Sequence, residues 1–199
     1  MPGEAGKQPP VRRWDVSAGV GVRFFDGADL GDSYSNWNGA WQPRVQVGRY
    51  LTPHLKLEFM AVPPVTHHFY NDELVPVPGL PAPVYAFSEH RSRVVSVTPL
   101  LTWQFLENAF AHPFVSAGCE VGVLEERITR LQQTRRAGLT DTVPAANSRR
   151  DAVQVRPVVA AGFKSYFNER VFVRPESNLA FGRPGISQFT LRLDVGIDF

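Results

Sequence analysis

One short stretch of the sequence contains residue types that could perform hydrolysis. His90 and Ser92 are separated by one residue, and Glu89 precedes them. A histidine that takes the proton from a serine hydroxyl makes that oxygen a nucleophile. The two side chains must lie within hydrogen-bond reach, and an ordinary polar sequence at the start of a strand is the alternative interpretation. We favour that alternative and predict no catalytic residue in this chain.

Two further histidines could bind a metal ion. His67 and His68 are adjacent, and Asp72 and Glu73 follow within a few residues. A zinc site needs three or four ligands that converge on one point, which adjacent histidines rarely do without help. We therefore expect a solvated loop here, with no metal and no other cofactor.

Arginines gather between residues 127 and 151. If this segment faces the outside of a cell, its guanidinium groups could bind the phosphates of lipopolysaccharide, because arginine holds phosphate through two parallel hydrogen bonds. The alternative is a solvated charged loop, in which Glu125, Glu126, Asp141 and Asp151 balance the positive charge. The arginines are Arg127, Arg130, Arg135, Arg136, Arg149 and Arg150.

Charges of both signs recur at alternate positions in the rest of the chain. They are Arg44, Lys56, Glu58, Glu120, Arg156, Lys164, Arg174, Glu176, Arg192 and Asp194. Such a set could line a path for protons or ions, or it could form salt bridges that plug a narrow interior. We predict the plug, because eight strands enclose an interior just wide enough for side chains. Isolated buried charge is very costly, so these groups must pair.

The elements that would position these charges are strands, because the sequence alternates with a period of two. From Trp14 to Phe25 the even positions are apolar or aromatic, and the odd positions are mostly polar or glycine. The segment from Ser187 to Phe199 alternates in the same way. Eight such runs are predicted, at 14–25, 40–51, 55–63, 88–105, 114–126, 152–167, 171–181 and 187–199.

The connections between these runs alternate in length. Three at one rim are short, at 52–54, 106–113 and 168–170. Of the four at the other rim, three are long, at 26–39, 64–87 and 127–151, and the last, at 182–186, is short. Short turns at one rim and long loops at the other are typical of bacterial outer-membrane barrels. The predicted fold is therefore all-β, a closed eight-stranded antiparallel up-and-down transmembrane β-barrel over residues 14–199. Residues 1–13 are predicted to form a disordered N-terminal segment.

Alternation alone does not say which face points outward. A soluble lipocalin-like barrel that binds a ligand would place its apolar face inside. The opposite is predicted here, because the polar face carries charges and glycines, whereas the apolar face has almost no charge at mid-strand. Aromatic residues also gather beside the short turns, as expected at a membrane interface. These are Trp14, Tyr50, Trp103, Phe105, Phe114, Tyr166, Phe167, Phe172 and Phe199.

Composition excludes several other classes of protein. The formal net charge of +2 and the lack of a basic stripe argue against nucleic-acid binding. The single cysteine, Cys119, excludes an internal disulfide framework. No run of about 18 apolar residues predicts a transmembrane helix. Residues 1–13 do not have the pattern of a signal peptide. Since an outer-membrane protein needs one, we expect that it is removed or that it precedes this start.

The eight alternating runs and the terminal aromatic residue resemble the small outer-membrane barrels of the OmpA/OmpX type. That resemblance implies an integral protein of the Gram-negative outer membrane, with a structural or surface-interaction role. It also implies that Phe199, at the end of an alternating strand, is the signal read by the barrel-assembly machinery. The expected partners are outer-membrane lipid, lipopolysaccharide and that machinery.

The second half of the chain resembles the lipid A deacylase (PagL) branch. The segments that carry this likeness are Pro99–Phe105, Pro113–Gly118, Ser177-Asn178 and Pro184-Gly185. In that branch a His-x-Ser pair and a glutamate lie on a late strand, and Ser177 stands at the matching serine. Proline occupies position 175, where the histidine is expected, so Ser177 lacks its base. A deacylase-like membrane hydrolase is therefore the alternative function, and not the favoured one.

Overall fold

A computed structural model describes residues 13–26, 37–75, 84–105, 111–136, 139–182 and 185–199. Residues 1–12 lie outside the described ranges, so the disorder expected of the N-terminal segment stays a prediction. Within the described ranges, no helix has the length and hydropathy needed to cross a membrane.

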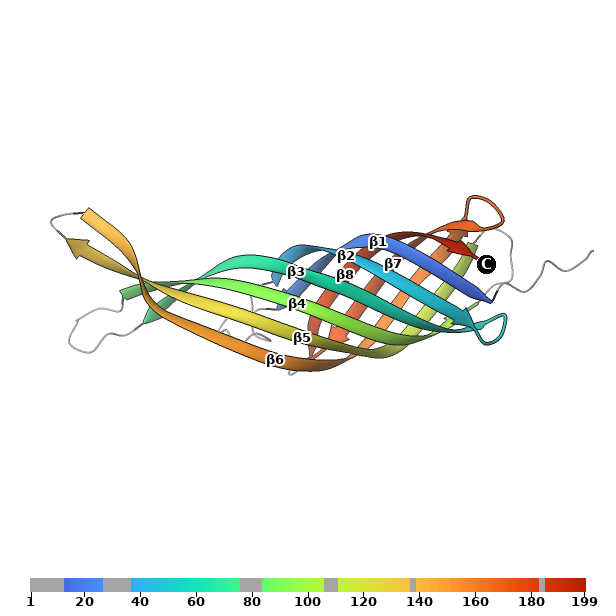
Figure 1. Cartoon of the computed structure of the whole chain (residues 1–199), viewed down its shortest axis with the longest axis horizontal. Coiled ribbons are helices and arrows are strands. Elements are labelled where there is room, and N and C mark those ends of the chain that lie inside the picture. The colour runs from blue at the N-terminus through green and yellow to red at the C-terminus, as the bar shows by residue number, and fades with distance from the viewer. Residues whose placement is uncertain (1–12, 27–36, 76–83, 106–110, 137–138, 183–184) are drawn as a thin grey trace, which may run out of the picture. The chain divides into compact units, whose positions relative to one another are not determined.

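Eight strands follow one another along the chain, and each pairs with its neighbours. The first strand also pairs with the last, which closes the barrel (Figure 1). The predicted closed antiparallel fold is therefore confirmed. The strands are β1 (Trp14–Asp26), β2 (Trp37–Tyr50), β3 (Leu55–Val75), β4 (Val84–Gln104), β5 (Ala111–Arg136), β6 (Leu139–Tyr166), β7 (Val171–Phe181) and β8 (Ile186–Asp198).

The two ends of the described chain lie side by side where the barrel closes. The register of β1 and β8 is continuous from the pair Asp15–Asp198 to the pair Phe25–Gln188. Beyond it, the Trp14 amide donates to the Phe199 carbonyl at 3.0 Å, and the Phe199 amide donates to the Trp14 carbonyl at 2.9 Å. The last residue of the chain is thus part of the ladder that closes the barrel.

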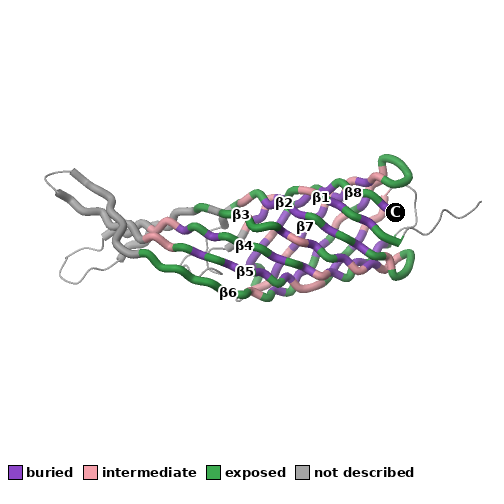
Figure 2. The backbone as a smooth tube through the Cα atoms, in the orientation of Figure 1, coloured by how far each residue is buried: buried purple, intermediate pink, exposed green. Residues whose placement is uncertain are grey.

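Buried and exposed residues alternate along the strands (Figure 2). Most buried residues are polar and many exposed ones are apolar, which is the reverse of a soluble protein. Along β8, Leu191, Leu193, Val195 and Ile197 are each about half exposed, at 50–55%. The intervening Arg192 and Asp194 are buried. The apolar face therefore points outward, as predicted, and the arrangement required of a lipocalin-like barrel is not the one observed.

Polar side chains stabilise the short turns. Between β2 and β3, the Thr52 hydroxyl accepts hydrogen bonds from the amides of His54 at 3.3 Å and Leu55 at 2.9 Å. Between β6 and β7, Asn168 Oδ1 accepts from the amides of Arg170 at 2.9 Å and Val171 at 2.8 Å. Such side-chain bonds replace the backbone partners that a tight turn leaves unused, which explains why these connections are short.

Four strands are longer than the alternating pattern predicted. The structure continues β3 to Val75, starts β4 at Val84, continues β5 to Arg136 and starts β6 at Leu139. The prediction of long loops at 64–87 and 127–151 is therefore wrong for most of their length. Pairing continues because each antiparallel neighbour satisfies backbone groups, whether or not a side-chain face is apolar. A hydrophobic period reveals only strands with one apolar face.

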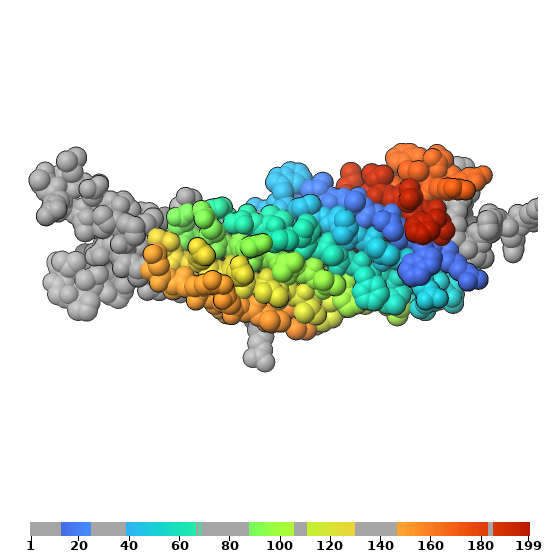
Figure 3. All heavy atoms as spheres, viewed as in Figure 1, coloured from blue at the N-terminus to red at the C-terminus, as the bar shows by residue number. Residues whose placement is uncertain are grey.

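The chain divides into two compact units. The barrel unit contains Met1–Val62, Val97–Val121 and Val155–Phe199. It includes all of β1, β2, β7 and β8 and the parts of the other strands next to the short turns, which we call the turn side. The extension unit contains Pro63–Ser96 and Gly122–Gln154, which are the remaining parts of β3 to β6. Figure 3 shows the side chains of β1 (blue) and β2 (cyan) packed side by side on one face of the barrel unit.

Candidate functional site

All ten charges predicted for the interior lie in the barrel unit, and all ten are buried. Each approaches an opposite charge on another strand, and they form connected groups along the lumen. The positions follow from the period of two, because a strand that presents apolar residues outward turns the alternate residues inward.

The turn-side end of the lumen holds two lysines between two aspartates. Lys164 Nζ donates to Asp198 Oδ1 at 2.5 Å and to Asp15 Oδ2 at 3.0 Å. Lys56 Nζ donates to the same Asp15 oxygen at 2.7 Å. Asp15 and Asp198 were not among the predicted site residues, although both occupy inward positions at strand ends. Their alternation with apolar neighbours was the available signal.

A second group crosses the barrel from one side to the other. Arg174 donates to both oxygens of Glu58, at 2.5 and 3.0 Å. These residues lie on β7 and β3, which are diametrically opposite in an eight-stranded ring. Lys56 and the Thr102 hydroxyl also bond to Glu58. The ring centroid of Phe114 lies 4.1 Å from the Arg174 guanidinium carbon, so the cation stacks on an aromatic face.

A third group depends on a glycine. Arg44 holds Asp194 through two hydrogen bonds, although β2 and β8 are separated by β1. Gly19 of β1 is paired with Arg44 on one side and with Asp194 on the other. A Cβ atom at Gly19 would collide with the Asp194 carboxylate, so this close approach requires glycine. Glu176 Oε1 lies 3.1 Å from Arg192 Nη1 and 3.5 Å from Arg44 Nη1.

A fourth group is a single carboxylate shared by two arginines. Glu120 accepts from Arg23 Nη2 at 2.7 and 3.0 Å and from Arg156 Nη2 at 3.0 Å. Arg23 lies on β1 and Glu120 on β5, so this pair also crosses the full ring. Arg23 was absent from the predicted site residues. Chemically, the four groups are fixed charges of opposite sign that connect nonadjacent strands.

Four aromatic residues predicted for the membrane interface lie inside the barrel instead. Phe114 and Phe172 are 2% and 0% exposed, and the hydroxyls of Tyr50 and Tyr166 bond to buried charges. Position near a strand end does not determine the face, and glycine leaves room inside. The Phe114 ring, for example, occupies the space that a side chain at Gly162 would need. The other five aromatics of the predicted set, Trp14, Trp103, Phe105, Phe167 and Phe199, are exposed on the outer face.

The extension unit brings His90 to different partners from those in the predicted motif. His90 Nδ1 lies 3.0 Å from Glu126 Oε1, and His90 Nε2 lies 3.0 Å from Ser88 Oγ. Glu89 alternates to the other face of β4 and approaches His68 at 3.7 Å. Sequence spacing identified the histidine but missed Glu126, because that partner comes from another strand.

No metal site is found among the described residues. They contain no group of three or more histidine, cysteine, aspartate or glutamate side chains that could hold an ion. The side chains of His67, Asp72 and Glu73 lie outside the described set, so the predicted absence of a metal stays a prediction.

Arginines line a polar groove in the extension unit. Arg91, Arg127 and Arg149 border a space of about 500 Å³ together with Glu89 and Asn147. These arginines come from β4, β5 and β6, and the side chains of Arg127 and Arg149 are exposed. Of the other arginines in the predicted loop, Arg150 is also exposed. The side chains of Arg130, Arg135 and Arg136 lie outside the described set.

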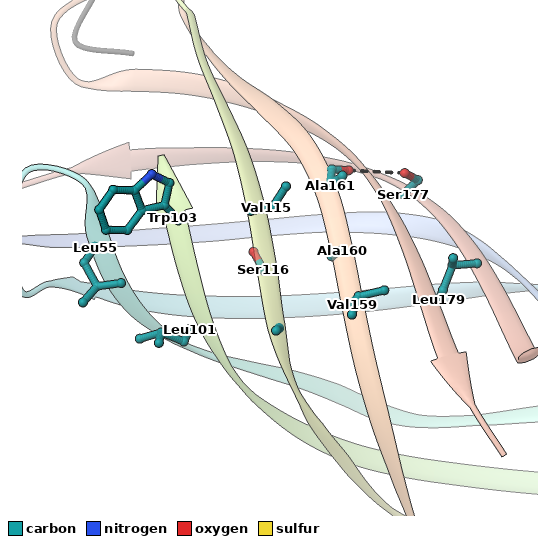
Figure 4. A pocket seen from close by; sticks show the side chains of 11 residues that line it. Leu55, Leu101, Trp103, Val115, Ser116, Val159, Ala160, Ala161, Ser177 and Leu179 are labelled. Atoms are coloured by element: carbon teal, nitrogen blue, oxygen red, sulfur yellow. Dashed lines mark hydrogen bonds between the residues drawn. The ribbon is translucent and has the colours of Figure 1, made fainter. Parts of the chain in front are cut away.

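The serine that resembles the deacylase nucleophile lies on the outer face of the barrel unit. Ser177 donates to the Ala161 carbonyl at 3.3 Å. It lines an apolar groove of about 580 Å³ that also contacts Leu101, Trp103 and Leu179 (Figure 4). No histidine or carboxylate is among the residues that line this groove. The neighbouring Glu176 points inward to arginines. Ser177 therefore has no base in this groove to remove its proton.

The same fold occurs in small barrels of known structure. OprG from Pseudomonas aeruginosa superposes with a TM-score of 0.57 at 12% identity, over 94% of this chain and 97% of that one. Neisserial surface protein A gives a TM-score of 0.55 at 11% identity, over 94% and 97%. The N-terminal barrel domain of Pseudomonas aeruginosa OprF gives 0.50 at 17% identity, over 94% and 98%. No protein-family model and no curated protein matches the chain.

The closed eight-stranded barrel, its apolar exterior and its charged interior together define a small outer-membrane β-barrel. The chain has the fold of this class, as the resemblance to the OmpA/OmpX type implied, and its apolar face points outward, as a lipid-facing surface requires. At these levels of identity the likeness concerns the fold alone.

Proposed function

We propose that this protein is a structural barrel with a plugged lumen, which acts through surface interactions of its extension unit. The observation that carries the proposal is the pair of ion bridges that cross the full ring, Glu58–Arg174 and Arg23–Glu120. Side chains that meet across so narrow a barrel fill it and leave no continuous water path. A barrel without such a path does not work as a pore, and this favours structural support or recognition at the surface over transport.

The purified protein is expected to give no stepwise currents in a planar lipid bilayer, because the ion bridges occupy the lumen. Electrical recording in concentrated potassium chloride measures this directly. A general porin inserted by the same procedure is the positive control for insertion and detection. Reproducible single-channel steps from the wild-type protein would contradict the plug.

We propose further that the arginine groove of the extension unit binds phosphate groups of lipopolysaccharide. Three arginines from different strands border one groove, and guanidinium groups hold phosphate through paired hydrogen bonds. Arg149 is already held 3.1 Å from Asp151 and 4.0 Å from Glu125, which orders its side chain before a ligand arrives. An ordered side chain loses less conformational entropy on binding.

Changing Arg91, Arg127 and Arg149 together to alanine is expected to weaken binding of purified lipopolysaccharide by at least about tenfold, since each charged hydrogen bond contributes about 1.5–3 kcal/mol. Binding is measured by titration of the detergent-folded protein, and dephosphorylated lipopolysaccharide is expected to bind as weakly as the triple variant does. The control is the double change Arg49→Ala and Arg170→Ala, which removes exposed arginines from the turn side. Equal loss in the control would contradict a specific groove.

We also propose that the C-terminal strand is the signal for the barrel-assembly machinery. Phe199 is 61% exposed on the outer face, and its backbone hydrogen-bonds to β1 only once the barrel closes. Before closure, the same strand edge and aromatic ring are available for an assembly factor to pair with.

A further inference from the structure

Three side chains of the extension unit are arranged as a nucleophile, a base and an orienting acid. Ser88 Oγ lies 3.0 Å from Nε2 of His90, and Nδ1 of the same ring lies 3.0 Å from Glu126 Oε1. An ionised carboxylate only accepts hydrogen bonds, so the proton of the neutral ring belongs on Nδ1. Nε2 then carries the lone pair that accepts the Ser88 proton.

The three residues become less buried from the acid, Glu126, through His90 to the nucleophile, Ser88. Glu126 is 0% exposed and His90 is 3% exposed, whereas Ser88 is only partly buried. The second oxygen of Glu126 has no hydrogen-bond partner among the described residues. The hydrogen bond between Glu126 Oε1 and His90 Nδ1 keeps the ring in one tautomer and one orientation.

We propose that Ser88, His90 and Glu126 form a catalytic triad that hydrolyses carboxylic esters. Ser88 Oγ attacks the ester carbonyl carbon while its proton passes to Nε2 of His90. The tetrahedral intermediate then collapses, and the alcohol oxygen leaves with that proton, so that Ser88 carries the acyl group. Water next attacks the acyl carbon and gives a proton to His90, which returns it to Ser88 Oγ as the carboxylic acid departs. Glu126 stays ionised and stabilises the imidazolium that forms in each step.

This inference departs from the sequence-based prediction that the chain contains no catalytic residue. It also differs from the deacylase-like alternative, because Ser177 lies in the barrel unit and takes no part. It does not depend on the arginine groove, because Glu89 and Arg91 alternate with Ser88 and His90 and so occupy the other face of β4. The expected substrates are carboxylic esters with short acyl chains that can reach a partly exposed serine.

The test uses the full chain folded in detergent micelles. A fluorophosphonate probe reacts with activated serines, and mass spectrometry of the digested protein locates the modified residue. Hydrolysis of p-nitrophenyl butyrate, an activated ester, gives the rate in parallel. The variants are Ser88→Ala, His90→Ala and Glu126→Gln. The matched control is Ser92→Ala, which removes the serine on the other side of His90. A heat-modifiable band on a gel verifies that each variant is folded.

Labelling at Ser88 is expected in the wild type and in Ser92→Ala. The Ser88→Ala and His90→Ala variants are expected to lose hydrolysis by a factor on the order of 10²–10⁴, and Glu126→Gln to lose a smaller but measurable part. If a variant fails to fold, the wild-type label still decides. Absence of label at Ser88, or hydrolysis that persists in folded His90→Ala, would overturn the proposal.

Discussion

The change Arg174→Met is expected to destabilise the folded barrel by about 3–5 kcal/mol, the usual cost of removing one partner from a buried ion pair. Arg174 donates to both oxygens of Glu58 and also lies 3.0 Å from Glu176. Methionine keeps apolar bulk against Phe114 but leaves both carboxylates without this cation. The measurement is equilibrium unfolding in urea of protein folded into lipid vesicles, followed by tryptophan fluorescence.

The exposed pair Arg149–Asp151 provides the matched control for this prediction. Arg149→Met removes a guanidinium that water already solvates, so no measurable change in the free energy of unfolding is expected. The double variant Glu58→Gln, Arg174→Met should recover part of the loss, because no uncompensated charge then remains at that pair. If Arg174→Met were as stable as Arg149→Met, the cross-barrel pair would not hold the barrel together.

The change Leu193→Arg is expected to cost roughly 2–4 kcal/mol of stability in a bilayer, because it places a charge on the lipid-facing surface at mid-strand. Leu193 is 52% exposed and is paired with Val20 near the middle of β1. Unfolding in vesicles, carried out as for Arg174→Met, measures the loss.

A second outward-facing residue, near the end of β8, serves as the control for depth in the bilayer. Ile197 has nearly the same exposure, 50%, but lies one residue before the end of β8. Ile197→Arg is expected to cost only about 0–1 kcal/mol, since an arginine near the interface reaches water. Equal effects of the two substitutions would mean that the apolar face does not lie across a bilayer.

Much of the fold could be predicted from the chain because its outer face obeys one simple rule. Lipid requires apolar side chains at every second position, and this period is visible from Trp14 to Phe25 and from Ser187 to Phe199. The rule does not identify strand segments outside the lipid-facing surface, because both sides of such a segment can be polar. This is why the ends of β3, β4, β5 and β6 were underestimated.

The site was predictable only as a set of residues that share a face. Period-two alternation placed Arg174 and Glu58 inside, but it could not pair them, because they are 116 positions apart. It likewise identified His90 and missed Glu126, which lies 36 positions away on another strand. Such pairings depend on how far neighbouring strands are staggered, and staggering is a property of the closed ring rather than of any one strand.

The sequence by itself therefore determined the number of strands, the direction in which each face points and the identity of ten of the buried charges. These follow from local alternation and from the high free-energy cost of placing charge in lipid. Only the tertiary structure decided which charges meet, which aromatic rings turn inward and which serine reaches His90. Those outcomes require strand register and the space that particular glycines leave for other side chains. Gly19, for example, leaves room for the pairing of Arg44 with Asp194. Neither the register nor this space exists before the barrel closes.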